Sequence, residues 1–172
     1  MSERYILVES PKKLRLKISI SVDRQATGDN SELRKKFEDV LKSKAPSWKI
    51  TCTSFSWAQE FEIGGGFYYD LSAELIVQPS AANAKPLVFV EFRVLVPSSL
   101  SSTAEIIAFD DVVATMFSVP VQPIVATFLE QEITDYVPPS PSKPTTTAQK
   151  FPWWIVIVVG VIALLIFTMS RR

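Results

Sequence analysis

The feature that most constrains this chain is a long apolar run near its C-terminus. No residue between Trp153 and Ser170 is charged. A helix over such a run, at about 1.5 Å per residue, approaches the roughly 30 Å of a bilayer's hydrocarbon core. A lone strand would leave its backbone unsatisfied in lipid, so the β-branched residues of the run do not favour one there. The run predicts a transmembrane helix over residues 152–170, and a buried core helix or strand is the alternative.

Side chains that favour membrane interfaces stand at both ends of this run. Two tryptophans stand at its start and two arginines follow it, and both residue types are enriched where hydrocarbon meets lipid headgroups. Residues 171–172 are therefore a short basic tail, and a lipid bilayer is a predicted partner. The predicted anchor residues are Trp153, Trp154, Ile155, Gly160, Leu164, Leu165, Phe167, Arg171 and Arg172.

A segment rich in proline, serine and threonine precedes the anchor at residues 138–151. This composition favours an extended, polyproline-like chain, which at about 3.1 Å per residue reaches on the order of 40 Å. We expect the segment to be a stalk that separates residues 1–137 from the bilayer. Those residues are enough for one domain with a sizeable core.

Apolar periodicity predicts the first elements of that domain. Apolar and polar residues alternate over residues 14–22, which is typical of a strand with one buried face. Asp29 and Glu32 then form a capping box, and a helix that ends before Pro46 follows it. The apolar residues at helical spacing are Leu33, Phe37, Val40 and Leu41.

A long hairpin is predicted next. The alternation that begins at Trp48 changes phase near Thr53 or Ser54, which indicates a β-bulge. Three glycines at 64–66 then turn the chain into a strand over 67–77. These glycines do not resemble a phosphate-binding loop, because neither the Lys-Ser/Thr pair nor the helix start of such a loop follows them.

Three further strands are predicted from residues outside the hairpin. Residues 4–9 form a short strand, and residues 87–96 form a longer one in which Glu91 and Arg93 face away from the core. Residues 124–136 alternate well enough for a last strand, although a short helix is also compatible with this segment.

A second capping box, from Ser102 to Glu105, predicts another helix. Its buried side would carry Ile106, Phe109, Val113 and Met116. The predicted fold class is therefore α+β, with a mainly antiparallel sheet and two helices on one face, similar to a split β-α-β arrangement. The other face would carry polar residues, namely Arg15, Lys17, Asp70, Glu74, Glu91 and Arg93.

The composition argues against catalysis. The chain has no histidine and a single cysteine, so it lacks the commonest general base and metal ligand and has no histidine to activate a thiol. Asp110 and Asp111 are adjacent and would not share a helix face, whereas Glu60 and Glu62 share a strand face without further oxygen ligands in sequence. Both pairs are interpreted as solvated charges. No nucleotide-binding, nucleophile-elbow or kinase motif occurs. We expect no enzyme activity, no cofactor and no metal.

Charge is distributed unevenly along the chain. Residues 1–50 hold twelve basic and seven acidic residues, a net charge of +5, whereas residues 51–137 hold two basic and eleven acidic residues, a net charge of −9. This indicates either a solvated surface or a bipolar domain that packs against copies of itself or another protein. The basic residues alternate with acidic ones, so nucleic acid is not an expected partner.

Two groups of residues are candidates for protein contacts. Lys35 and Lys36 lie on the polar side of the first predicted helix. Aromatic residues crowd the hairpin tip, where a partner or membrane contact competes with ordinary core packing as the interpretation. The aromatic candidates are Phe61, Phe67, Tyr68 and Tyr69.

These features predict a non-enzymatic, single-pass, tail-anchored protein that tethers a protein assembly to a membrane. One concrete version is a virion protein that links a capsid shell to an internal membrane. The first residues do not resemble a secretory signal and Cys52 cannot form an intrachain disulfide, so we expect residues 1–137 in the cytosol or on the shell side of a virion membrane. The alternatives are a cellular tail-anchored adaptor and a ligand- or lipid-binding module that uses the aromatic hairpin.

Overall fold

The computed structural model describes residues 5–23, 25–91, 96–121 and 124–140, with the backbone alone for residues 60–63. Contacts divide the chain into two units, Met1–Val137 and Pro138–Arg172. All of the described helices and strands belong to the first unit. The predicted anchor and most of the predicted stalk lie outside the described residues, so both remain predictions.

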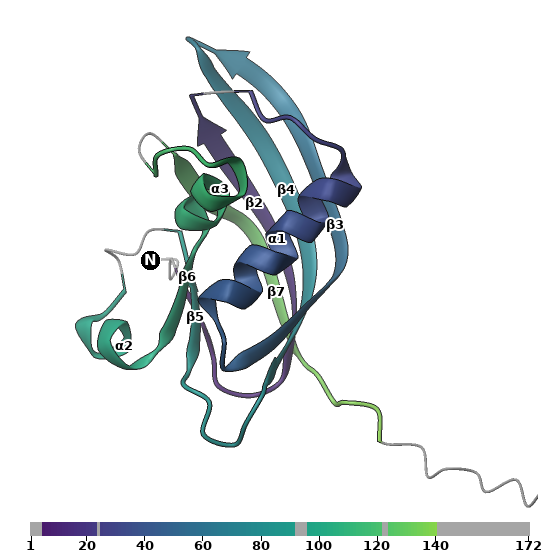
Figure 1. Cartoon of the computed structure of the whole chain (residues 1–172), viewed down its shortest axis with the longest axis vertical. Helices are drawn as coiled ribbons and strands as arrows, with labels where there is room; N and C mark the ends of the chain where they lie inside the picture. The colour runs from purple at the N-terminus through teal and green to yellow at the C-terminus, as the bar shows by residue number, and fades with distance from the viewer. Residues whose placement is uncertain (1–4, 24, 92–95, 122–123, 141–172) are drawn as a thin grey trace, which may run out of the picture. The chain divides into compact units, whose positions relative to one another are not determined.

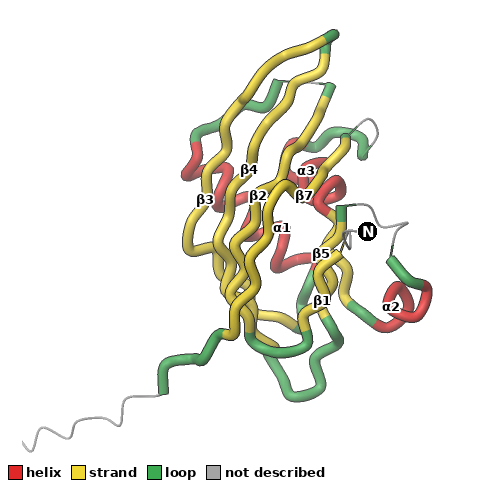
Figure 2. Tube along the Cα trace, turned by 180° about the vertical axis from the view of Figure 1, so that it is seen from behind, coloured by secondary structure: helices red, strands yellow, loops and turns green. Residues whose placement is uncertain are grey.

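A four-stranded antiparallel sheet is the largest element of the first unit. Its strands lie in the order β3 (Trp48–Ile63), β4 (Gly66–Pro79), β2 (Lys12–Val22) and β7 (Val125–Asp135), as Figure 2 shows from behind. The alternation predicted for β2 is confirmed, because every second residue from Leu14 to Val22 is buried. The strand predicted over 124–136 is confirmed as β7, and the helix alternative for this segment is wrong.

The β3–β4 hairpin has the predicted tight turn. Gly64 and Gly65 have φ values of 59° and 81°, and Ile63 pairs with Gly66 across the turn. A two-residue turn with positive φ at both positions matches the twist of the strands that it joins, and glycine adopts it without steric cost. The predicted bulge is also confirmed, since the register of β3 shifts between Cys52 and Ser54.

Helix α1 (Asn30–Lys44) crosses the inner face of this sheet and packs mainly on β3 (Figure 1). It begins as predicted, because the Asp29 side chain accepts a 2.8 Å hydrogen bond from the Glu32 backbone N–H. The predicted core residues are confirmed and the helix ends before Pro46. Its buried residues are Leu33, Phe37, Val40 and Leu41.

A second sheet, which the sequence did not predict, has three strands. β5 (Leu87–Val90) lies in the middle, antiparallel to β1 (Tyr5–Val8) and parallel to β6 (Glu105–Ala108). Helix α2 (Ser98–Thr103) lies between β5 and β6 in the chain, and helix α3 (Phe109–Phe117) follows β6. The described fold is therefore α+β with mainly antiparallel sheets and three helices, and the expectation of a single sheet is wrong.

The helix predicted from the second capping box is also wrong at its start. The Ser102 hydroxyl donates to carbonyls of the preceding turn of α2, and Glu105 begins a strand instead. The Glu105 backbone N–H donates to the Pro86 carbonyl at 2.8 Å, and the Glu105 carboxylate accepts from the backbone N–H and hydroxyl of Ser47. Tertiary partners of Glu105 outweigh the local capping pattern, and the helix begins at Phe109.

Of the strand predicted over 87–96, the structure describes Leu87–Val90 as a strand that does not alternate, and residues 92–95 lie outside the described residues. All four residues of β5 are buried, because the main core covers one face and a smaller cluster that includes Val96 covers the other. Glu91 is buried as well, at 4% exposed, and does not face solvent as predicted. Arg93 lies outside the described residues.

An aromatic cluster joins the two sheets and the helices. The fully buried ring of Phe109, at the start of α3, lies 6.4 Å from Phe37 of α1, 6.0 Å from Phe89 of β5 and 5.5 Å from Phe128 of β7. Such ring pairs add to the stabilisation from burial alone. Both sheets therefore share one core, and α1 and α3 lie on the same face of the larger sheet (Figure 1).

Candidate functional site

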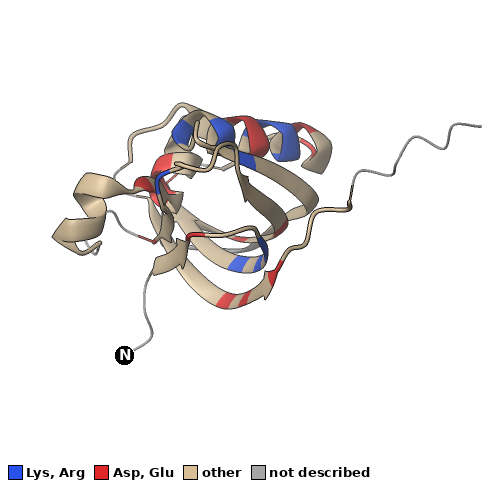
Figure 3. Cartoon of the chain, turned by 90° about the horizontal axis from the view of Figure 1, so that it is seen from below, with Lys and Arg blue, Asp and Glu red and all other residues tan. Residues whose placement is uncertain are grey.

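The outer face of the larger sheet carries charges that pair with one another. The Arg15 guanidinium lies 2.9 Å from carboxylate oxygens of Glu74 and Glu132, on the strands either side of it. Basic bands of β2 accordingly lie beside acidic bands of β7 in Figure 3. The hydrogen bond to Glu74 raises the pKa of Arg15, and the same bond lowers the pKa of Glu74. This face presents mixed, exposed pairs instead of a field of one sign.

The two candidate lysines lie on the exposed face of α1. The Lys36 ammonium is 2.9 Å from the Glu32 carboxylate one turn earlier, and Lys35 is exposed beside it. Acidic and basic residues are interspersed along this helix (Figure 3). Exposed pairs of this kind stabilise a helix only slightly, so both lysines are accessible to a partner.

The structure places the candidate aromatic residues in different environments. Tyr69 is buried, stacks on Trp57 at 4.9 Å between ring centroids and accepts a 2.7 Å hydrogen bond from the Ala26 backbone N–H through its hydroxyl. Phe67 and Tyr68 are half-buried, and the side chain of Phe61 lies outside the described part. Tyr69 therefore packs inside the domain and is not available at its surface.

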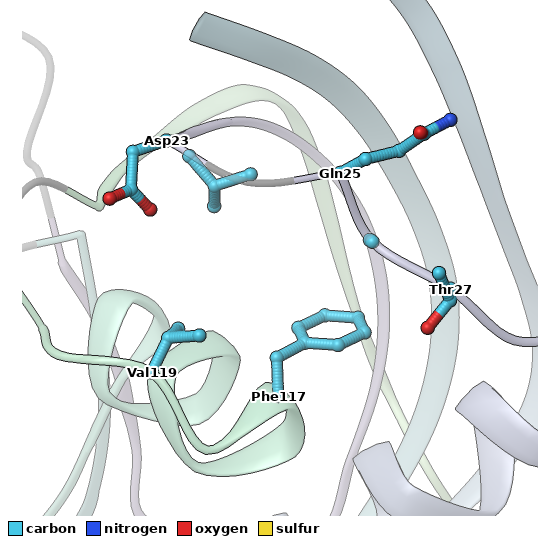
Figure 4. A pocket seen from close by; sticks show the side chains of 7 residues that line it. Asp23, Gln25, Thr27, Phe117 and Val119 are labelled. Carbon is cyan, nitrogen blue, oxygen red and sulfur yellow. The ribbon is translucent and has the colours of Figure 1, made fainter.

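A hollow of about 170 Å³ lies between the end of β2 and the end of α3. Figure 4 shows Phe117 and Val119 facing the loop that carries Asp23 and Gln25. The Phe117 ring also packs on Trp57, at 5.6 Å between centroids, so the hollow adjoins the aromatic stack. Its wall is mainly apolar, with a polar rim, and is too small for most cofactors.

The titratable groups Cys52, Glu91 and Asp110 lie in the interior. The interpretation of Asp110 as a solvated charge is wrong, because this residue is only 8% exposed. Burial raises the pKa of the Cys52 thiol, which opposes the thiolate that nucleophilic chemistry needs. The buried Glu91 carboxylate accepts a 2.6 Å hydrogen bond from the Phe128 backbone N–H. Over the residues with described positions, no group of three or more acidic, cysteine or histidine side chains could hold a metal ion.

Side chains of α1 cover the outer edge of β3. The Arg34 guanidinium donates to the Cys52 carbonyl, and the Glu38 carboxylate accepts from the Cys52 backbone N–H at 3.0 Å. The Asn30 side chain accepts from the Trp57 backbone N–H at 3.1 Å. These backbone groups point away from β4, so α1 occupies hydrogen-bonding positions that another strand would need.

The edge formed by β7 differs, and sequence reasoning did not single it out. Leu129 and Ile133 are 53% and 43% exposed, and every residue from Leu129 to Asp135 is exposed. A register shift against β2, between Lys17 and Ile18, accommodates Leu129 as an extra residue. One sequence signal could have indicated this edge, namely the break in apolar–polar alternation at Leu129. The prediction of one continuous strand over 124–136 did not use it.

Neither sequence nor structure relates this chain to a known protein. The chain matches no known protein family, no curated protein and no solved structure. Among the described helices, none is long and apolar enough to cross a membrane, and the predicted anchor lies outside these residues.

Proposed function

We propose that this chain is a non-enzymatic, single-pass membrane protein that tethers a protein assembly to a lipid bilayer. Residues 1–137 bind other proteins or copies of the chain, residues 138–151 form a stalk, and residues 152–170 form the anchor. The uncharged run between Trp153 and Ser170, with its interfacial tryptophan and arginine pairs, carries the proposal.

Two further observations support a role in binding instead of catalysis. The chain contains no histidine, and its single thiol is buried with a raised pKa. The first unit exposes charged groups on α1 and apolar groups on β7, which are surfaces suited to protein contacts. A virion protein that joins a capsid shell to an internal membrane is one concrete form of this function, and a cellular tail-anchored adaptor is another.

A ligand-binding module is the second candidate function, and the hollow beside Phe117 favours it. At about 170 Å³ the hollow is smaller than most ligand sites, which span roughly 300–1,000 Å³. Its volume is close to that of an enclosed engineered cavity of about 150 Å³ that binds benzene, but the hollow is partly open and also lined by Asp23, Gln25 and Thr27. Saturable binding of benzene or a similar small aromatic, lost in Val119→Trp, would support this candidate over the tether.

The tether is tested by flotation with liposomes. The full chain should float with the vesicles, whereas a chain that lacks residues 151–172 should remain in the soluble fraction and still unfold in one cooperative thermal transition. A matched control replaces residues 152–170 by a polar segment of equal length and should also fail to float. If the shortened chain still floats after a wash in high salt, the anchor is not the membrane contact and the proposal is wrong in this part.

The assembly is tested by charge reversal on α1. Lys35→Glu with Lys36→Glu should slow association of the detergent-solubilised chain at low salt, because charge patterns steer encounter and exposed charges are screened over roughly 8 Å at physiological salt. Lys85→Glu, on a loop, is the matched control. The unchanged chain, the double variant and Lys85→Glu are compared at low and at high salt. Equal association rates under all of these conditions would mean that Lys35 and Lys36 belong to a solvated surface only.

A further inference from the structure

We infer that the outer edge of β7 is a docking site for an extended basic segment of a partner protein, which adds to the larger sheet as a further strand. This inference deepens the proposed function and rests on it, because the partner would be a component of the tethered assembly. It concerns residues 129–135, the part of β7 that is exposed throughout.

The backbone of this segment is suited to a further strand. The Tyr136 backbone N–H donates to the Pro11 carbonyl, on the β2 side, at 3.1 Å. Successive residues of an antiparallel strand point to opposite edges, so the N–H groups of Ile133 and Asp135 face away from β2. Within the described part of the chain, the side-chain hydrogen bonds and ion pairs of residues 129–135 all go to β2.

The neighbouring part of the same edge shows how such backbone groups are satisfied inside the fold. The Phe128 N–H also faces away from β2, and the buried Glu91 carboxylate accepts its hydrogen bond at 2.6 Å. Phe128 is half-buried, whereas Leu129 and the residues after it are exposed. Glu91 therefore satisfies the outward-facing backbone N–H of Phe128, and the exposed segment begins at the next residue.

Two apolar side chains add exposed hydrophobic surface to this segment. Leu129 and Ile133 are about half exposed, at 53% and 43%. Ile133 pairs with the buried Leu14, so it lies on the core-facing side of the sheet at the margin of the core. A strand beside β7 would cover such side chains while it satisfies the backbone, which is how edge addition combines affinity with specificity.

Charge selects a basic partner over a second copy of the chain. Glu130 and Glu132 pair in register with the basic residues Lys17 and Arg15 of β2, on the outer face of the sheet. A basic strand on the open side would repeat this arrangement of opposite charges across β7. Two copies joined through β7 would instead bring the glutamates of both strands together, and like charges across a strand pair are destabilising.

The test uses the full chain in non-ionic detergent and a fluorescent peptide of about nine alternating lysine and valine residues, a typical strand length or slightly more. Fluorescence anisotropy should show saturable binding, and a glutamate–valine peptide should bind at least about tenfold more weakly. Glu130→Lys should weaken binding of the lysine–valine peptide by about tenfold, whereas Lys35→Glu on α1 should leave it unchanged. Empty detergent micelles control for binding to detergent.

Proline substitutions test the backbone directly. Ile133→Pro removes an N–H that faces outward, which edge strands tolerate, so the chain should fold but lose peptide binding. Ile133→Val keeps the N–H and an apolar side chain and should bind as the unchanged chain does. Thr134→Pro removes an N–H that faces β2 and should destabilise the fold, which confirms the assignment of edges.

Three outcomes would overturn the inference. The first is that the lysine–valine peptide fails to bind to the unchanged chain. The second is that binding survives both Glu130→Lys and Ile133→Pro. The third is that Ile133→Pro abolishes self-association in sedimentation, which would identify a second copy of the chain as the occupant. Liposome flotation of the same variants separates this failure from that of the tether. If the unchanged chain floats but binds no lysine–valine peptide, the docking site alone is disproved, whereas loss of flotation by the unchanged chain disproves the anchor.

Discussion

The two edges of the larger sheet are protected in different ways. At the β3 edge, side chains of α1 bond to the backbone of Cys52 and Trp57. At the β7 edge, residues 129–135 carry exposed acidic and apolar side chains, and Leu129 is accommodated by a bulge. Where α1 bonds to the β3 backbone it blocks a partner strand of any charge, whereas acidic side chains on an edge disfavour only strands of the same charge.

The spacing of three polar residues on α1 explains the first kind of protection. Asn30, Arg34 and Glu38 are four residues apart, so they lie along one side of the helix. That side runs along β3, because Leu33, Phe37 and Leu41 hold the neighbouring side of the helix on the core. Part of the polar surface of α1 is therefore occupied by the sheet edge, which leaves fewer of its charges for partners.

Removal of the Glu38 carboxylate should have the largest effect on this comparison. In Glu38→Ala the backbone N–H of the buried Cys52 loses its acceptor, and an unsatisfied buried donor costs about 1–3 kcal/mol. Urea denaturation should show this loss in the free energy of unfolding. Asp39→Ala, at the next and exposed position, should change it by less than about 0.5 kcal/mol. Equal losses would mean that Glu38 does not protect the edge.

Removal of Asn30 should have a smaller effect. Its side chain accepts one hydrogen bond from the Trp57 backbone, a neutral pair near the surface, and Asn30→Ala should cost about 0.5–1.5 kcal/mol. Hydrogen exchange of the Trp57 amide should quicken more than that of residues in β4. An unchanged exchange rate at Trp57 would show that β3 keeps this group covered without α1.

The β3 edge should also weaken in acid. Burial raises the pKa of Glu38, but hydrogen bonds from Lys42 and from the Cys52 backbone outweigh burial and hold the pKa below its usual 4.5. A depressed pKa contributes stability that is present above pH 4.5 and is lost as the pH falls through the folded value. The thermal unfolding temperature of Glu38→Gln should therefore fall less than that of the unchanged chain as the pH drops below 4.5. Identical pH profiles of the two chains would contradict this.

Substitution at the exposed β7 edge should have the smallest effect on folding. Leu129 is 53% exposed, so Leu129→Lys should change the free energy of unfolding by less than about 0.5 kcal/mol. The same substitution adds a basic group where we infer that a basic strand docks, so it should weaken peptide binding without unfolding the chain. A large loss of stability would show that Leu129 packs as a core residue and that the two edges are protected in more similar ways.

Local elements with strong patterns could be predicted from the sequence. β2 alternates over residues 14–22, α1 has a capping box at Asp29 and a regular apolar stripe, and the β3–β4 turn has two glycines where positive φ is required. In each case the deciding interactions lie within one element or one turn. The apolar run over 152–170 is a sequence signal of the same kind, because its length and lack of charge are compared with the bilayer alone.

The elements that were predicted wrongly depend on partners distant in the chain. Ser102 and Glu105 match a capping box, but Glu105 bonds to Ser47 and Pro86 and forms a strand. β5 does not alternate, because two clusters bury both of its faces. A local pattern cannot report what covers the second face of a strand.

The candidate sites divide in the same way. The sequence by itself determined that Lys35 and Lys36 lie on the polar side of a helix, since helical periodicity alone sets that side. Only the tertiary structure decided that Tyr69 is buried against Trp57, that α1 covers the β3 edge and that β7 ends the sheet with residues 129–135 exposed. The physical reason is that an edge is defined by which strands fail to pair with it, and pairing joins residues as distant in sequence as β2 and β7.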